Sequence, residues 1–465
     1  MNYLLYPAAF IFILGSAVVI HEFGHFLVAK LFKIRVETFS VGFGPRLFGY
    51  KWGHTDYRLS AIPLGGYVKL GGDESNAPIE GAGATDIPPE EQFNLRPRWQ
   101  RILVALAGPV MNIITALAIP FAGALMYGVP AAPAPIVSSI AGNGAAAAAG
   151  LQRGDRIVSF NGIENPKWDT IRGDALLSPG QPLPVVVDRN GQRIPLTITP
   201  TPHVEDGETA GFLDFVPDYG DLPVIVREVE ANTPAAEAGL QPDDRIVAVS
   251  GQPVRSAEQV TQFIRDHKGQ LITLTVDRNG QRVDITATSR KLADGRERLG
   301  FRPDEEIPLH KVGMAAAGTY AVNSNLEILR LTGKALGQFF TGQRSARNTL
   351  SGPVGIYKAA GSAVERFGWG GFFTTLAFLS LNLGVFNLLP IPVLDGGAIF
   401  LLLIEGALAI VGLKLSMRIR ERIQQVGFVM VILLMVFVIT NDILKQASIW
   451  RGGDSPPPAA ATPAK

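Results

Sequence analysis

Four long runs without charged side chains constrain the fold of this chain more than any other feature of its sequence. They cover residues 3–20, about 102–128, 367–394 and 423–441. A helix of about 20 apolar residues is long enough to cross the hydrocarbon core of a bilayer. The sequence therefore predicts a multi-pass α-helical membrane protein with about four spans, embedded in a lipid bilayer.

Two prolines, Pro390 and Pro392, interrupt the end of the third run. Proline donates no backbone hydrogen bond, and a freed backbone group at membrane depth must face protein or a wet cavity. We therefore expect a broken third span. The first run lacks the basic flank and the small-residue cleavage site of a signal peptide, so we expect it to be retained.

Composition agrees with a membrane protein and excludes several kinds of site. Hydrophobic residues make up 47% of the 465 positions and charged residues only 18%, which is too apolar for a typical soluble enzyme. The formal net charge of +1 gives no basic field for a nucleic acid, so we expect no nucleic-acid partner. The chain has no cysteine, so any metal must be bound by His, Asp or Glu.

Lysine and arginine gather in the segments between the first two runs and between the last two. They are Lys30, Lys33, Arg35, Arg46, Lys51, Arg96, Arg98 and Arg101, and then Lys414, Arg418, Arg420 and Arg422. Basic residues beside spans mark the cytoplasmic side of a membrane. The long section between the second and third runs, and both termini, are then expected on the opposite side.

That long section contains an internal repeat. Residues 149–162 read AGLQRGDRIVSFNG, and residues 238–251, which begin 89 positions later, read AGLQPDDRIVAVSG. The same spacing of 89 relates two further pairs, VDRNGQR at 187 and 276 and Gly-Phe at 211 and 300. Repeated matches at one spacing indicate a duplicated domain. The Val/Ile-rich runs and the Asp-Arg-Asn-Gly turns predict a small mixed β domain in each copy.

Each copy resembles the PDZ domain in its circularly permuted bacterial form. The pairs Gly211-Phe212 and Gly300-Phe301 resemble the carboxylate-binding loop of that family. Such a loop presents backbone N–H groups to a peptide C-terminus, while the peptide adds as a strand to a sheet edge. The alternative, that these pairs are only turn and core residues, stays open because Asp214 would repel a carboxylate in the first copy.

The first run contains a candidate metal site. His21 and His25 lie four positions apart on a predicted helix, so both imidazoles can reach one ion, and Glu22 completes the HExxH pattern. In this pattern two histidines bind zinc and the glutamate activates water. An ionisable side chain near the bilayer centre costs roughly 2.5–3.5 kcal/mol on insertion scales, which favours a functional role over a merely satisfied polar cluster.

A catalytic zinc needs a third protein ligand, and Asp395 is the only acid in the segment 366–404. Asp395 lies near the end of the string NLLPIPVLDGG at 387–397, where the broken span turns back. It could also cap a helix that begins near Ala398, and the two roles can coexist. Asn387 in the same string can donate a hydrogen bond to a substrate carbonyl or developing oxyanion, or it can bridge two helices.

HEFGH in the first run and NLLPIPVLDGG in the third together resemble the site-2 protease family of intramembrane zinc metalloproteases. The tandem PDZ-like copies resemble its bacterial branch, the regulators of sigma-E protease. The likeness extends over residues 3–442 and includes two local strings, AGPVMN at 107–112 and a candidate membrane-reentrant β-hairpin with GFGP at 42–45 and LGGYV at 64–68.

The resemblance implies roles for particular residues. His21, His25 and Asp395 would be the ligands of Zn²⁺, Glu22 the catalytic base, and Asn387 a residue that holds substrate. Ala398 stands where many relatives have His after LDGG, but that His is not a metal ligand in the family.

The expected fold class is a multi-pass α-helical membrane protein of about four spans, one of them broken, with a membrane-reentrant β-hairpin and two inserted small mixed α/β PDZ-like domains. The expected segments are 1–34 for span one, 35–98 for the β region, 99–130 for span two, 131–220 and 221–309 for the two PDZ-like domains, 310–366 for an amphipathic helical linker, 367–413 for broken span three, 414–445 for span four and 446–465 for a disordered tail.

The expected function is an intramembrane zinc endopeptidase in the bacterial inner membrane, with the PDZ-like domains in the periplasm. It would cleave single-pass membrane proteins, such as a pre-trimmed anti-sigma factor or a signal-peptide remnant, and peptide or periplasmic segments would bind at the PDZ-like domains. A silent PDZ scaffold is the alternative, and the complete set of His21, Glu22, His25 and Asp395 argues against it. A metal transporter is disfavoured because the spans show no internal repeat.

Overall fold

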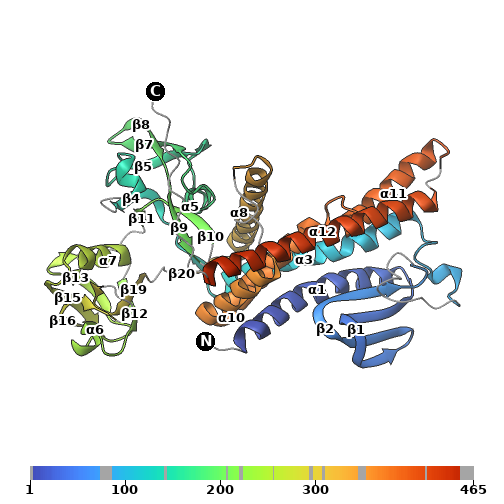
Figure 1. The fold of residues 1–465 in the computed structure, drawn as a ribbon, viewed down its shortest axis with the longest axis horizontal. Helices are drawn as coiled ribbons and strands as arrows, with labels where there is room; N and C mark the ends of the chain where they lie inside the picture. The colour runs from blue at the N-terminus through green and yellow to red at the C-terminus, as the bar shows by residue number, and fades with distance from the viewer. Residues whose placement is uncertain are drawn as a thin grey trace. The chain divides into compact units, whose positions relative to one another are not determined.

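The computed structural model describes residues 4–73, 86–140, 144–205, 208–218, 224–254, 256–292, 297–305, 309–343, 352–413 and 416–450. Most of the expected disordered tail, residues 451–465, lies outside this description. The chain divides into two compact units. One, here called the membrane unit, consists of Met1–Met126 and Gly313–Lys465; the other, here called the inserted unit, is Tyr127–Val312. Both are visible in Figure 1.

The membrane unit is built mainly from long helices. They are α1 (Leu5–Leu31), α3 (Arg98–Met126), α8 (Met314–Phe340), α10 (Pro353–Asn387), α11 (Asp395–Ile410) and α12 (Met417–Trp450), with a short 3-10 helix η1 (Pro89–Glu91). Among the described residues, α1, α3, α10 and the segment Arg422–Leu444 of α12 are long and apolar enough to cross a membrane. Each of the four uncharged runs thus supplies one candidate span.

Glycines bring the central helices into close contact. A Cβ on Gly24 of α1 would lie 2.3 Å from the carbonyl oxygen of Ala107 in α3, and one on Gly384 of α10 would lie 2.9 Å from the carbonyl oxygen of Pro109. Small residues permit such backbone approach between helices in membranes. Helices α1, α3 and α10 therefore pack directly against one another around the HEFGH motif.

Helix α10 changes direction at Gly368, whose φ of 55° and ψ of −131° are not helical. A Cβ on Gly371 would lie 2.0 Å from the carbonyl oxygen of Ala363, so the two parts of α10 approach closely beside the kink. The uncharged run begins at residue 367, next to this kink. Helix α10 ends at Asn387 and α11 begins at Asp395, so the chain breaks at the two prolines as expected.

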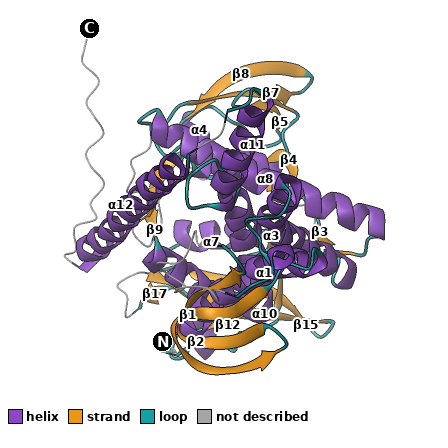
Figure 2. Ribbon diagram, turned by 90° about the vertical axis from the view of Figure 1, so that its right-hand side faces the viewer, coloured by secondary structure: helices purple, strands orange, loops and turns teal. Residues whose placement is uncertain are grey.

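A long antiparallel hairpin follows α1. Its strands are β1 (Val36–Trp52) and β2 (Thr55–Leu70), and Trp52 pairs with Thr55 at the turn. Figures 1 and 2 show the hairpin beside α1, which it contacts through both strands. Toward the turn its large side chains are exposed, with Phe48, Tyr50 and Trp52 each more than 70% accessible. The expected β-hairpin is therefore present.

The inserted unit contains two sheets of the same design. In the first copy the strand order is β11-β4-β5-β7-β8, with β6 beside β5, and in the second it is β16-β15-β13-β12-β19, with β14 beside β13. The first copy comprises β4 (Ala134–Ile140), α4 (Ala145–Ala148), β5 (Arg156–Phe160), β6 (Ile163–Glu164), α5 (Trp168–Leu176), β7 (Leu183–Arg189), β8 (Gln192–Ile198), the hairpin β9 (Thr201–Glu205) and β10 (Glu208–Phe212), and β11 (Phe215–Asp218).

The second copy comprises β12 (Val224–Val229), α6 (Pro234–Glu237), β13 (Arg245–Val249), β14 (Gln252–Pro253), α7 (Ala257–Asp266), β15 (Leu271–Arg278), β16 (Gln281–Thr288), the pair β17 (Arg290–Lys291) and β18 (Glu297–Arg298), and β19 (Phe301–Glu305). At the ends of the unit, β3 (Val129–Pro130) pairs with β20 (Leu309–His310).

The two copies bury equivalent residues at the spacing of the sequence repeat. Val187 and Val276 are both fully buried in their cores. Each copy also holds a buried aspartate by two hydrogen bonds of 2.7 Å from one arginine, Asp155 from Arg189 and Asp244 from Arg278. The repeat in the sequence is therefore a repeat in the structure.

Candidate active site

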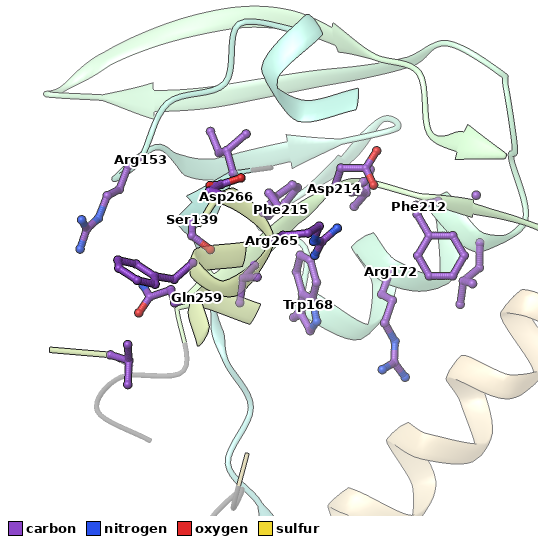
Figure 3. A pocket seen from close by; sticks show the side chains of 18 of the residues that line it. Ser139, Arg153, Trp168, Arg172, Phe212, Asp214, Phe215, Gln259, Arg265 and Asp266 are labelled. Carbon is purple, nitrogen blue, oxygen red and sulfur yellow. The ribbon is translucent and has the colours of Figure 1, made fainter. Parts of the chain in front are cut away.

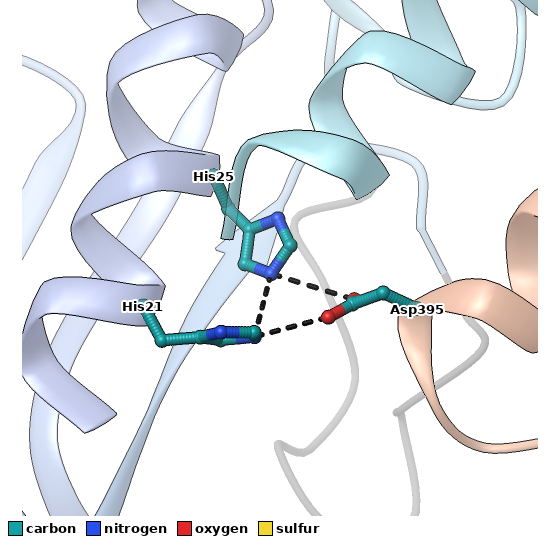
Figure 4. Close-up of side chains that lie close together, drawn as sticks. All are labelled: His21, His25 and Asp395. Carbon is teal, nitrogen blue, oxygen red and sulfur yellow. Dashed lines mark hydrogen bonds and ion pairs between the residues drawn. The ribbon is translucent and has the colours of Figure 1, made fainter. Parts of the chain in front are cut away.

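Three side chains meet at the point where α1 faces the start of α11 (Figure 4). The Nε2 atom of His21 lies 3.0 Å from Oδ2 of Asp395, and Nε2 of His25 lies 3.4 Å from Oδ1. The two Nε2 atoms are 3.2 Å apart. Ligand atoms of all three residues lie within 4.8 Å of one another, so one ion can contact all three. Two imidazoles and a carboxylate are a donor set that suits a catalytic zinc with one open position.

Space for an ion is preserved by a glycine on the facing helix. A Cβ on Gly108 of α3 would lie 2.4 Å from Nε2 of His25 and 2.8 Å from Nε2 of His21. Both distances are shorter than a van der Waals contact. Helix α3 therefore presents bare backbone to the ligand nitrogens, which supports the fit of a metal ion here.

The ring of His25 is oriented by α3. Its Nδ1 atom lies 2.7 Å from the carbonyl oxygen of Val104, to which Nδ1–H donates. A histidine that binds a metal through Nε2 commonly donates its other N–H to a carbonyl or carboxylate in this way. The Nε2 lone pair of His25 then points toward Asp395.

Glu22 follows His21 on α1 and faces the hairpin. Its carboxylate lies near the backbone of Val68 in β2, and its Cγ atom would lie 3.5 Å from a Cβ built on Gly66. The hairpin thus holds the glutamate of the HExxH motif from the side opposite α3.

Asn387, the last residue of α10, also reaches this site. Its Nδ2 atom lies 3.4 Å from Nε2 of His21. Both roles that the sequence left open, substrate contact and interhelical bridge, fit this position. The structure brings together every metal-site residue predicted from the sequence.

Asp395 does not cap its helix through its side chain. The N-cap of α11 is Leu394, and Asp395 is the first helical residue. Its carboxylate faces the histidines instead, so the alternative role of a cap near Ala398 is wrong. The glycines after it permit the turn, because a Cβ on Gly396 or Gly397 would lie within 2.3 Å of a backbone carbonyl in the segment 388–391.

Asn112 was given no role in the sequence analysis, although it belongs to the site. Its Nδ2 atom lies 3.3 Å from Nδ1 of His21. Gly108 and Asn112 are four residues apart and therefore share a face of α3. That spacing within AGPVMN was the available signal, but it does not show which helix the face meets.

The two Gly-Phe pairs do not occupy equivalent places. Gly300 directly precedes edge strand β19, whereas Gly211 and Phe212 end β10 and pair with β9. The carbonyl of Leu299 accepts from Ala235 N, and that of Leu213 accepts from Ala146 N. The structural counterpart of Leu299-Gly300-Phe301 is therefore Leu213-Asp214-Phe215, and not the segment at the repeat spacing.

At this loop the first copy carries its own carboxylate. Oδ2 of Asp214 accepts a 3.0 Å hydrogen bond from the backbone of Ala145 at the start of α4, and another from the hydroxyl of Thr201. Asp214 has a φ of 57° and Gly300 a φ of 88°, so both adopt the left-handed conformation. The aspartate lies at the edge of a cavity of about 940 Å³ (Figure 3).

The second copy has a smaller cavity of about 310 Å³ beside the equivalent loop at Gly300. It is lined by residues of α7 and by the strand that follows Gly300, including Ile264, Arg265, Phe301 and Arg302. Helix α7 also contacts edge strand β19. The groove between an edge strand and a helix is the shape that strand-addition binding requires.

The family model described as Peptidase family M50 matches residues 9–434. This chain belongs to peptidase family M50. The regulator of sigma-E protease RseP of Escherichia coli is 34% identical over 95% of this chain and 99% of the relative. A putative zinc metalloprotease of Vibrio cholerae is 32% identical over 94% of this chain and 98% of the relative.

Among solved structures, the PDZ domain of the SdrC-like protein of Listeria monocytogenes covers 19% of this chain and 93% of its own length, with 20% identity and a TM-score of 0.17. The M50 match and the relatives confirm the expectation of an intramembrane zinc metalloprotease of the site-2 protease family, with Zn²⁺ as its cofactor.

Proposed function

We propose that this M50 protease binds zinc through His21, His25 and Asp395 and cleaves single-pass membrane proteins within the bilayer. One observation carries the proposal: two histidines from a candidate span and the aspartate after a broken span converge within hydrogen-bonding distance. Unpaired ionisable groups are costly in a membrane, and a shared metal ion accounts for all three.

The side chains around the site divide the chemistry between them. Zinc, when bound, supplies Lewis-acid activation of water and of the scissile carbonyl. Glu22 accepts a proton from the attacking water and delivers it to the leaving amide nitrogen, and its place beside the Val68 backbone of the hairpin directs its carboxylate. Asn387 donates from its amide to the developing oxyanion.

The hairpin β1–β2 is proposed to re-enter the membrane beside the site. Its contact with α1 and the exposed aromatic side chains near its turn support this placement, because such side chains favour lipid or the membrane interface. In that position an edge of the hairpin is available to an extended substrate segment next to Glu22.

The proposed substrates are anti-sigma-factor-like membrane proteins whose periplasmic parts have already been trimmed. The proposed location of the enzyme is the bacterial inner membrane. The names of the relatives, regulators of sigma-E protease, support this choice. The basic segments between the spans support a cytoplasmic placement for those segments and a periplasmic one for the inserted unit.

Peptide binding is proposed for the second PDZ-like copy. The groove beside β19 and α7 and the absence of a side chain at Gly300 support it. In the first copy the corresponding place is occupied by the Asp214 carboxylate, so we expect no C-terminal carboxylate to bind there.

The test combines metal analysis with cleavage of a membrane-anchored helix by purified protein in liposomes. Wild type should contain stoichiometric zinc and cleave. Glu22→Gln should keep the zinc and lose cleavage by at least about 100-fold, since only proton transfer is removed. Asp395→Ala should lose both zinc and cleavage. Full zinc and full turnover in Asp395→Ala would show that the ligand set is wrong.

A further inference from the structure

His21 needs an acceptor for one ring proton. If Nε2 faces the metal, as the distances to Asp395 and His25 require, the neutral ring carries its proton on Nδ1. His21 is only 6% exposed, so water is not a ready acceptor. The partner of Nδ1 must therefore come from the protein.

Asn112 is the side chain beside that atom. It is fully buried, its Nδ2 lies 3.3 Å from Nδ1 of His21, and its Oδ1 has no hydrogen-bond partner among the residues that the structure describes. In this arrangement two donors, Nδ2 of Asn112 and the protonated Nδ1 of His21, face each other, while the acceptor Oδ1 of Asn112 has no partner among the described residues. A half-turn of the amide exchanges oxygen and nitrogen at almost the same positions, and amide orientation is assigned from such networks.

We propose that Asn112 is a positioning residue, whose Oδ1 accepts a hydrogen bond from Nδ1–H of His21 and thereby fixes the tautomer and ring orientation of this ligand. The inference rests on the proposed role of His21 as a zinc ligand. It goes beyond that role because it assigns a function to a residue that would not touch the metal.

The pattern on α3 supports this assignment. Val104, Gly108 and Asn112 are spaced by four and lie on one face of the helix. The carbonyl of Val104 accepts from His25, Gly108 leaves room for both Nε2 atoms, and Asn112 reaches His21. One helix face thus orients both histidines, each through the nitrogen that points away from the metal. Such outer partners commonly change metal affinity by about 10- to 100-fold when they are removed.

The experiment measures zinc affinity of the full-length protein in detergent by competition with a chromophoric chelator. Asn112→Leu keeps a similar volume and removes the acceptor, so zinc should bind about 10- to 100-fold more weakly. Asn112→Asp keeps an acceptor at the same place and should remain within a few-fold of wild type. The absorption spectrum of the Co²⁺-substituted protein should change in Asn112→Leu and not in Asn112→Asp.

Asn325→Leu is the matched control. Asn325 is another buried asparagine, and its amide donates to the carbonyl of Ala116 on the same helix α3. Its loss should lower thermal stability and leave the zinc affinity of the folded protein unchanged. If Asn112→Leu does not accumulate as folded protein, Asn112→Ala makes the same comparison.

Wild-type zinc affinity in the folded Asn112→Leu or Asn112→Ala protein would overturn the inference, and so would equal losses in Asn112→Leu and Asn112→Asp. The failure of the proposed function looks different, because Asp395→Ala would then keep its zinc. Loss of zinc in Asp395→Ala together with unchanged affinity in Asn112→Leu would reject only the role of Asn112.

Discussion

At the residue scale, the metal site depends on the shape of α3 as much as on the ligands themselves. Gly108 faces both ligand nitrogens, and Gly24 on α1 meets α3 at the same level. A bare helix face lets two histidines of the neighbouring helix turn toward one point. Chemistry at this site is therefore sensitive to a single added methyl group.

Replacing Gly108 with Ala should weaken zinc binding. The added Cβ would lie 2.4 Å from Nε2 of His25, so the ring must move away from the other ligands. We expect zinc affinity to fall by at least about 10-fold, measured by chelator competition. Gly123→Ala on the same helix is the control, because nothing lies within 4 Å of a Cβ there. Equal zinc affinity in both variants would contradict the role of Gly108.

At the element scale, each PDZ-like copy contains one ion pair between a buried aspartate and a partly exposed arginine. In the first copy, burial raises the pKa of the Asp155 carboxyl, but hydrogen bonds from Arg189 and from the Gln152 backbone outweigh this effect, and the pKa is lowered overall. The pair links the start of β5 to the end of β7. Its stability contribution therefore depends on the charge of Asp155.

Asp155→Asn should destabilise the first copy by about 1–3 kcal/mol at neutral pH, because the charge-assisted hydrogen bonds from Arg189 to the buried carboxylate are lost. Since the folded pKa is depressed, the contribution of Asp155 is complete above about pH 3.9, the value for an unfolded aspartate, and is lost as the pH falls through the folded value. Hydrogen exchange of the first copy, corrected for intrinsic rates, measures both effects. Exposed Glu164→Gln should change stability by less than about 0.5 kcal/mol. An acid response of Asp155→Asn identical to that of wild type would refute the linkage.

The loop before each edge strand differs between the two copies, with Asp214 in the first and Gly300 in the second. Replacing Asp214 with Gly should allow the first copy to bind a peptide with a C-terminal carboxylate. The variant should then show one more peptide-binding site than wild type, in which we expect only the second copy to bind. Isothermal titration with free and amidated forms of one peptide measures this gain. Asp214→Asn, which still fills the loop, is the control and should add no site. Unchanged binding by Asp214→Gly would argue against occupation by the aspartate.

This loop also shows where sequence reasoning reached its limit. The HExxH spacing and the lone acid after the prolines pointed to the three side chains that converge in the structure, because local spacing and the cost of charge in a membrane can be read from a sequence. The Gly-Phe match at the repeat spacing was misleading, because hairpin β9–β10 is longer than its counterpart β17–β18 and places the loop of the first copy at Asp214 instead of Gly211. The positions of Gly108 and Asn112 beside the histidines arise from packing between helices, which a single sequence does not encode locally.

At the scale of the whole molecule, we treat the inserted unit as a gate on substrate size and the membrane unit as the site of chemistry. The metal-site residues all belong to the membrane unit, and the grooves to the inserted unit. The proposed topology places the HEFGH motif toward the cytoplasmic end of α1, since roughly 24 Å of helix separates it from Leu5. On this view the two units act on different parts of a substrate.

Deleting residues 135–308 should leave cleavage of a short, pre-trimmed substrate largely intact. It should also permit cleavage of an untrimmed substrate with a bulky periplasmic domain, which the full-length enzyme refuses. Both substrates are assayed against both proteins in liposomes. Loss of activity on the trimmed substrate without gain on the untrimmed one would show that the inserted unit presents substrate to the site instead.

The pairing of β3 with β20 carries a consequence for how such a chain can diversify. Val129–Pro130 and Leu309–His310 pair with each other, so the chain enters and leaves the inserted unit at neighbouring positions. Because the entry and exit points are already joined, the length of the intervening chain places little demand on the helices. PDZ-like domains can therefore be lost, duplicated or replaced during evolution without straining the helices that carry the catalytic residues.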